Sequence, residues 1–235
     1  MSHLALISEH ASPLGSLGGV DSGGQNVYVA QVARHLAAFG HTVDVFTRRD
    51  DERLADVVEP IDRVRIIHVS AGPPSVMRKE DLLPWMDDFA RFVGDWCERE
   101  GKYDLVHANF FMSGIVAARL NDWFDIPFVI TFHALGRVRR LHQGAADGFP
   151  EERFEIEERL MAEAARIIAE CPQDRADQLI HYHADPNKLR VVPCGFDPEE
   201  LWPIDKAEAR AQLGLPIDDQ IVLHLGRLVP RKGAD

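Results

Sequence analysis

Short apolar runs alternate with segments of helical periodicity along most of this chain of 235 residues. Runs typical of buried strands lie at residues 4–8, 41–47, 64–69, 104–107, 127–132, 166–169 and 189–192. Apolar residues at helical spacing follow most of these runs, at 29–40, 81–100, 112–123, 156–164 and 173–182. Strands that alternate with helices pair in parallel and are covered on both sides. The pattern therefore predicts an α/β fold, with a Rossmann-like parallel sheet and helices on both faces.

The remaining segments suggest loops and a domain boundary. Residues 48–59 are charged and residues 134–150 are first basic and then glycine-containing, so we predict loops at both. Prolines 193, 198 and 203 indicate a linker, which is followed by a helix at 206–213 and a strand at 221–225. We predict two domains, at 1–198 and 199–235. The second would hold the linker and the first strand of a truncated Rossmann-like domain, which makes this chain the N-terminal portion of a longer protein.

Composition limits the partners and the compartment. The formal net charge of −12 argues against nucleic acid or an anionic membrane as the main partner. No apolar run approaches the roughly 20 residues that span a bilayer, and no signal segment opens the chain. The three cysteines are far apart and form no CxxC pair, which indicates a reducing compartment and no structural zinc. We expect a cytoplasmic protein, whose oligomeric state stays open.

A glycine-rich loop at 15–24 joins the first predicted strand to the first predicted helix. Such a loop lets a phosphate approach bare backbone near a helix N-terminus, but it is also typical of a flexible surface turn. The loop contains no G-x-G, which disfavours a dinucleotide site, and no Gly-Lys-Ser/Thr, which excludes a P-loop. The glycines alone leave the phosphate cradle and the flexible turn open.

Polar residues follow the predicted strands at their carboxyl ends, where open parallel sheets bind ligands. These residues are Lys79, His107, Asn109, His133, Cys171, Gly195, Arg227 and Lys232. A hydrolase is disfavoured because Ser22 does not lie in G-x-S-x-G, and the histidines have no carboxylate at ligand-like spacing, so no metal centre is predicted. An epimerase would need an acidic residue near the cleft, and the sequence shows no obvious one.

Four stretches carry a family resemblance: residues 21–29, 107–114, 131–137 and 226–232. Together they resemble the retaining GT-B glycosyltransferases of family 4. Within that family the chain is most similar to the branch that contains sucrose-phosphate synthase, sucrose synthase and the inositol-phosphate N-acetylglucosaminyltransferase of mycothiol synthesis. The fold that this implies is the N-terminal, acceptor-binding Rossmann-like domain of a GT-B enzyme.

The resemblance also implies roles for individual residues. The donor would be bound by Gly23, Gly24, Arg227 and Lys232. His133 would face the donor sugar, and the two cations would neutralise the leaving diphosphate, so these three are the catalytic candidates. The acceptor would be bound by Gln25, Asn26, Lys79, Phe110 and Arg153, with Arg78 and Arg137 as neighbours. Lys79 and Arg153 would hold an acceptor phosphate, although both also fit plain surface charges. Phe110 stands where the branch often has tyrosine, which leaves the acceptor's identity open.

The expected function is that of an enzyme. It would move a sugar from a nucleotide-diphosphate sugar to a sugar or sugar-phosphate-like acceptor, by same-face attack assisted by the leaving diphosphate. It would use the nucleotide sugar as co-substrate and hold neither a tightly bound cofactor nor a metal. The family's Glu-x7-Glu pair would lie beyond residue 235, so we expect this chain to be inactive alone. The alternative is a non-catalytic module of the same fold that binds a sugar phosphate or a nucleotide.

Overall fold

The computed structural model describes residues 1–15 and 23–224. The chain divides into two compact units, Met1–Pro193 and Cys194–Asp235. This division falls after Pro193, slightly before the boundary predicted after residue 198. In the described part of the second unit, the single regular element is helix α7 (Lys206–Leu213). The Asp205 carboxylate caps this helix by accepting from the backbone N–H groups of Ala207 and Glu208.

The first unit is built on an eight-stranded sheet with the strand order β3-β4-β2-β1-β5-β6-β7-β8. The strands are β1 (His3–Ile7), β2 (Thr42–Arg48), β3 (Val57–Ile61), β4 (Val64–Val69), β5 (Leu105–Asn109), β6 (Phe128–Thr131), β7 (Arg166–Ala169) and β8 (Leu189–Val191). All neighbouring pairs are parallel except β3 and β4, which are antiparallel at the edge of the sheet. The predicted α/β fold is confirmed.

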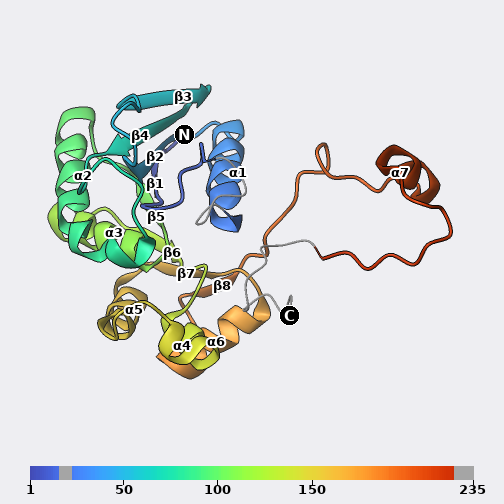
Figure 1. Ribbon diagram of the computed structural model, residues 1–235. Coiled ribbons are helices and arrows are strands. Elements are labelled where there is room, and N and C mark those ends of the chain that lie inside the picture. The colour runs from blue at the N-terminus through green and yellow to red at the C-terminus, as the bar shows by residue number, and fades with distance from the viewer. Residues whose placement is uncertain (16–22, 225–235) are drawn as a thin grey trace. The chain divides into compact units, whose positions relative to one another are not determined.

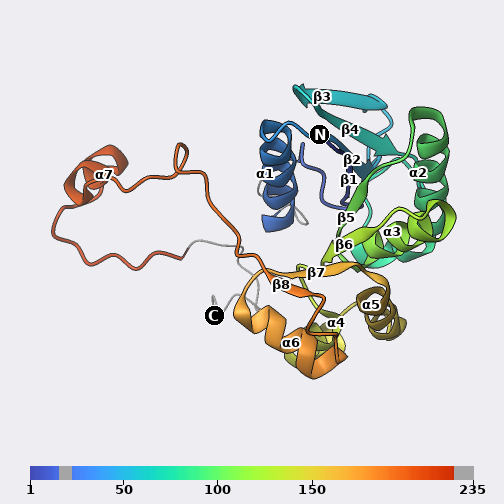
Figure 2. The ribbon, with the colours of Figure 1, turned by 180° about the vertical axis from the view of Figure 1, so that it is seen from behind.

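Helices lie on both faces of the sheet (Figures 1 and 2). Their bounds are α1 (Gly24–Ala38), α2 (Met86–Glu100), α3 (Phe111–Phe124), α4 (Gly136–Gln143), α5 (Glu152–Glu163) and α6 (Pro172–Tyr182). Helix α1 lies on one face, above a small apolar core that includes Val29 and Val45. Helices α2, α3 and α5 lie on the other face, over a larger core that includes Phe89, Phe111 and Leu160.

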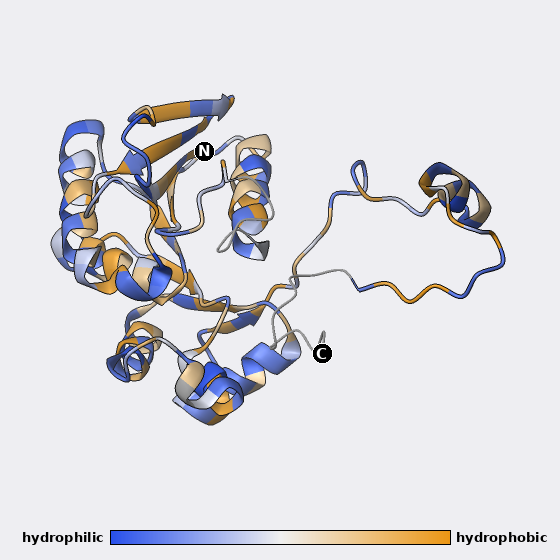
Figure 3. Ribbon diagram, viewed as in Figure 1, coloured by the Kyte–Doolittle hydropathy of each residue, from blue (hydrophilic) through white to orange (hydrophobic). Residues whose placement is uncertain are grey.

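The apolar patterns explain why these elements form. The strands concentrate hydrophobic residues, whereas the helices mix hydrophobic and hydrophilic ones (Figure 3). In α2, Met86, Phe89 and Val93 recur at helical spacing and are at most 1% exposed. Gly101, with φ of 102°, ends that helix in a conformation that other residues rarely adopt. A stripe of this kind is stable only when it is buried against the sheet.

Three predicted segments were wrong in detail. Residues 57–61 form the edge strand β3, although 57–59 were predicted as the end of a loop; the strand tolerates Pro60 because an edge strand need not donate on both sides. About half of the predicted loop at 134–150 is the helix α4, which is followed by a short 3-10 turn at Gly144–Ala146. Residues 221–224 form no strand, because no described strand pairs with them; Leu225, the last residue of that predicted strand, lies outside the described residues.

Gly114 fixes the close packing of α3 on the sheet. A Cβ at this position would lie 2.6 Å from Leu160 Cδ1 and 2.7 Å from Ile130 Cδ1. We expect Gly114→Ala to lower the free energy of unfolding by about 1–3 kcal/mol, because the core must move to admit the methyl group. Urea unfolding of the chain measures this. Gly24→Ala is the control, since a Cβ there meets nothing within 4 Å. Equal stabilities of the two variants would contradict the prediction.

Candidate functional site

The candidate site lies where the direction of the chain through the sheet reverses. From β1 the chain proceeds to β2 on one side, whereas β5 and the strands after it lie on the other side. A crevice forms at the carboxyl ends of β1 and β5, the two neighbouring strands at which the direction reverses. Gln25, in the first turn of α1, bridges this point: its Nε2 donates to Ser8 Oγ and to the Asn109 carbonyl, at 3.2 Å each. The structure thus brings the predicted Gln25 to the switch point.

The described end of the glycine-rich loop forms the start of α1. Gly23 is the N-cap and Gly24 the first helical residue, and a Cβ at either would meet nothing within 4 Å. Asn26 fastens this turn: its Oδ1 accepts from the Gly23 N–H at 3.0 Å, and its Nδ2 donates to the Ser12 carbonyl at 2.9 Å. Asn26 is buried, and its hydrogen bonds hold the start of α1 in place. Residues 16–22 lie outside the described part of the chain.

His133 lies next to the switch point, after β6. Its Nδ1 is 3.0 Å from Glu170 Oε1, and its Nε2 is 3.1 Å from Asn109 Oδ1. The Tyr28 ring packs edge-on against the imidazole, with centroids 4.9 Å apart. The φ of 56° at His133 is unusual for a residue other than glycine, and such conformations concentrate at functional sites. Residues at the carboxyl ends of β5, β6 and β7 and a residue of α1 therefore meet around one ring.

Glu170 was missed from the sequence. It directly follows β7, at the edge that the carboxyl-end rule selects, but the prediction named its neighbour Cys171. Cys171 instead caps α6, where its Sγ accepts from the Asp174 N–H at 3.4 Å. The sequence showed no obvious acidic residue near the cleft, and the structure places one there.

His107 is a second imidazole in this region, and it contacts the neighbouring strand β6. Its Nε2 lies 2.8 Å from Thr131 Oγ1. Burial, and next the charge of His133, lower the pKa of His107 to about 4, so that His107 is neutral at pH 7. His107 therefore brings no positive charge to this edge of the sheet.

Phe110 joins the switch point to a buried cation. Its φ is 86°, and its ring lies 5.1 Å from the ring of His10 and 4.9 Å from the guanidinium carbon of Arg153. The His10 Nδ1 is 2.7 Å from Glu9 Oε1, and the buried Glu9 also accepts from the Ser113 hydroxyl. The pair of Glu9 and His10 was not predicted, although both directly follow the first strand.

Arg153 is fully buried, so the surface-charge interpretation of this residue was wrong. Its Nε donates to Glu157 Oε1 at 2.7 Å, and its guanidinium carbon lies 4.6 Å from the ring centroids of both Phe111 and Phe149. It also donates to the Ala134 carbonyl, directly after His133. Its Nη1 has no hydrogen-bond partner among the residues that the structure describes. The guanidinium thus underlies the turn that carries His133.

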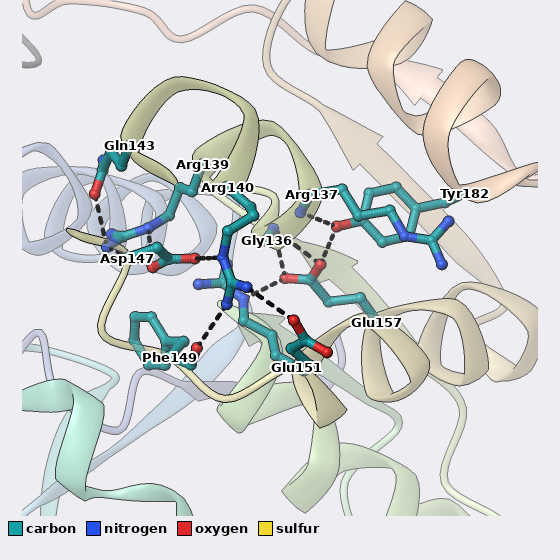
Figure 4. A network of polar contacts seen from close by, with 11 residues as sticks. Gly136, Arg137, Arg139, Arg140, Gln143, Asp147, Phe149, Glu151, Glu157 and Tyr182 are labelled. Carbon is teal, nitrogen blue, oxygen red and sulfur yellow. Dashed lines mark hydrogen bonds and ion pairs between the residues drawn. The ribbon is translucent and has the colours of Figure 1, made fainter. Parts of the chain in front are cut away.

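Glu157 collects donors from three helices (Figure 4). Besides Arg153 of α5, it accepts from the Gly136 N–H at the start of α4, at 2.9 Å, and from the Tyr182 hydroxyl at the end of α6. Burial raises the pKa of the Glu157 carboxyl, and Arg153 and Tyr182 act in the opposite direction. All three contacts are donors, which suits a carboxylate.

The basic residues of α4 are held by neighbouring acids (Figure 4). Arg139 lies 3.1 Å and Arg140 3.7 Å from the buried Asp147, and Arg140 also lies 3.1 Å from Glu151. Arg137 pairs with Glu158 at 2.6 Å. These pairs order the segment that the sequence predicted as a loop.

The other predicted residues lie on a different segment or outside the described chain. Lys79 opens a short 3-10 turn at Lys79–Asp81, next to Arg78, and is partly buried. Arg227 and Lys232 lie outside the described residues. Within residues 1–15 and 23–224, no group of histidine, cysteine and acidic side chains could hold a metal ion. No helix in that same part of the chain has the length and apolar character needed to cross a membrane.

Comparison with known proteins identifies the family. The sequence profile described as Glycosyltransferase Family 4 matches residues 22–200. The chain belongs to glycosyltransferase family 4. It is 40% identical to a D-inositol 3-phosphate glycosyltransferase of Geodermatophilus obscurus, over 99% of this chain and 52% of that protein. It is 39% identical to the enzyme of that name from Actinosynnema mirum, over 100% of this chain and 57% of that protein.

A solved structure agrees with this family-4 assignment. Sucrose-phosphate synthase from Thermosynechococcus elongatus matches with a TM-score of 0.91 and 35% identity, over 99% of this chain and 57% of that one. The predicted GT-B, Rossmann-like fold is thereby confirmed, as is the resemblance to family-4 glycosyltransferases. The family-4 chain spans about half the length of the relatives it matches.

Proposed function

We propose that this chain is the acceptor-binding part of a retaining glycosyltransferase that takes its sugar from a nucleotide-diphosphate sugar. The observation that carries the proposal is the convergence of Gln25, Asn109 and His133 at the switch point of a family-4 fold. Attack on the sugar would occur from the face that the diphosphate leaves, so no protein nucleophile is needed. The growing negative charge would be received by Arg227, Lys232 and the backbone of Gly23 and Gly24.

The proposed acceptor is a sugar or a sugar phosphate. The relatives include enzymes named for inositol 3-phosphate and for sucrose phosphate, which favours a polyol or sugar that carries a phosphate. An unpaired N–H in the interior is costly, and the Arg153 Nη1 next to the His133 turn would gain a partner from an anionic oxygen. Phe110 offers that oxygen no hydroxyl, so the phosphate would rely on Arg153 and Lys79.

A test begins with ligand binding to the full-length protein. A thermal-shift panel of sugar phosphates and nucleotide sugars selects the substrates, and the selected pair is then assayed for transfer. We expect release of nucleoside diphosphate and a product that keeps the donor's anomeric configuration, which NMR reads directly. An inverted product would refute the retaining mechanism. Binding without transfer would favour the second candidate, a non-catalytic module that binds a sugar phosphate or a nucleotide.

The chain of 235 residues is expected to show no transfer by itself, because the relatives carry about as much sequence again. Its folded state is checked by circular dichroism, and its activity by the release of nucleoside diphosphate under the conditions that suit the full-length protein. Turnover by the purified chain would sink this expectation. A folded chain without activity would show that transfer needs the rest of the protein.

A further inference from the structure

The Glu170 carboxylate lies against His133 at the carboxyl end of β7. The two side chains are 23% and 10% exposed, and their closest oxygen and nitrogen are 3.0 Å apart. The backbone N–H of Glu170 donates to Asp174 Oδ2 at 3.0 Å, which ties the end of β7 to the first turn of α6. The carboxylate therefore approaches the imidazole from a fixed backbone position.

The other ring nitrogen of His133 also faces an acceptor. The Asn109 amide is oriented by its Nδ2, which donates to the carbonyls of Ile7 and His107 at 3.3 Å each. Its Oδ1 is thereby turned toward His133 Nε2, at 3.1 Å. An amide oxygen and a carboxylate accept only, so the ring satisfies both when it carries a proton on each nitrogen. A neutral ring would set a lone pair against one of these oxygens.

We propose that Glu170 is a positioning residue that, together with Asn109, holds His133 as an imidazolium at the carboxyl ends of the strands. The part of this proposal that concerns catalysis rests on the proposed glycosyl transfer. A fixed positive charge at this point would act on the negative charge that grows on the leaving diphosphate. Glu170 would act through His133: it sets the direction of the ring and keeps both of its N–H groups in place.

The protonation of His133 is tested on the chain itself. In protein labelled with ¹⁵N-histidine, long-range ¹H–¹⁵N spectra at pH 7 distinguish a ring with two N–H groups from a ring with one. We expect two for His133, whose signals are assigned by their absence from His133→Asn. Glu170→Ala is expected to show the one-proton signature, and a neutral His133 in the unchanged protein would overturn the proposal.

Two further variants separate charge from fold. Glu170→Gln keeps an acceptor oxygen but removes the charge, so it is expected to remain folded and to lose the second ring proton. Asp177→Asn removes one negative charge from the same region, α6, where Asp177 accepts from Gln173 at 2.7 Å. It is expected to leave the His133 signals unchanged. If Asp177→Asn changed them as Glu170→Gln does, general electrostatics rather than the pairing would be responsible, and the proposal would fail.

Kinetics of the full-length protein test the consequence for transfer. We expect Glu170→Ala to lower kcat about 100-fold, because a misplaced reacting group costs about that much. The KM values for donor and acceptor are expected to change little, since the loss falls on the transition state. If the unchanged protein transfers no sugar, the proposed function fails and the spectra alone decide the pairing. If it transfers sugar and the Glu170 variants keep its kcat, the positioning role is wrong while the proposed function stands.

Discussion

Replacement of His133 by alanine in the full-length protein is expected to slow sugar transfer by about 10²- to 10³-fold, the loss typical of one preorganised charge-stabilising group. The ring lies among Asn109, Glu170 and Tyr28 at the site edge of the sheet, with 10% of its side chain exposed. Its removal takes away a ring donor, together with the positive charge that we propose for it above. Initial rates at varied donor and acceptor concentrations measure the loss.

The matched control for this variant is His142→Ala, which removes an exposed imidazole from α4. Its transfer rate is expected to equal that of the unchanged protein. Circular dichroism and thermal unfolding show whether the His133 variant keeps its fold. A folded His133→Ala protein with a rate within about tenfold of the original would lack the loss expected of such a group, and the catalytic role of His133 would have to be abandoned.

Replacement of Glu157 by alanine is expected to lower the free energy of unfolding by about 3–5 kcal/mol, the usual cost of breaking a buried ion pair from one side. Arg153 would remain fully buried among aromatic rings without its carboxylate. The Gly136 N–H and the Tyr182 hydroxyl would lose their acceptor as well. Urea unfolding of the chain, followed by tryptophan fluorescence, measures the change.

Two controls make this stability prediction specific. Glu163→Ala removes an equivalent acid from the same helix, where its 3.7 Å pair with Arg159 is exposed, so a change of at most about 1 kcal/mol is expected. The double variant Arg153→Met, Glu157→Leu removes both charges at similar volume, so it should recover the part of the lost stability that comes from the unpaired charge. A double variant as unstable as Glu157→Ala would show that the lost acceptor of Gly136 and Tyr182, not the unpaired charge, is the cause.

The parallel part of the sheet was predictable because its strands are buried runs of apolar residues separated by helical stripes. The edge strand β3 was not, since it follows a charged segment and contains Pro60, and only pairing with β4 makes it a strand. Helix α4 carries four basic side chains and no broad apolar stripe. It is stabilised by Asp147 and Glu157, which come from later in the chain, and such partners are invisible to local patterns.

The candidate site was predictable to the level of strands and less so to the level of single side chains. The carboxyl-end rule selected His133 and Asn109, but it could not tell whether Glu170 or Cys171 faces the neighbouring strand. Arg153 and Glu157 have the spacing of an ordinary exposed helix pair. Phe110, Phe111 and Phe149 bury this pair, and they come from two other parts of the sequence. Burial of a charge is decided by such distant neighbours.

The convergence of three helices on Glu157 also bears on how this sequence can evolve. Arg153, Gly136 and Tyr182 supply the donors, and each is costly to leave without the carboxylate. A Cβ at position 136 would also lie 2.9 Å from Arg153 Nε and 3.0 Å from Glu157 Oε2. No member of this set can be exchanged cheaply by itself. We therefore expect the four positions to stay unchanged together or to change together in related sequences.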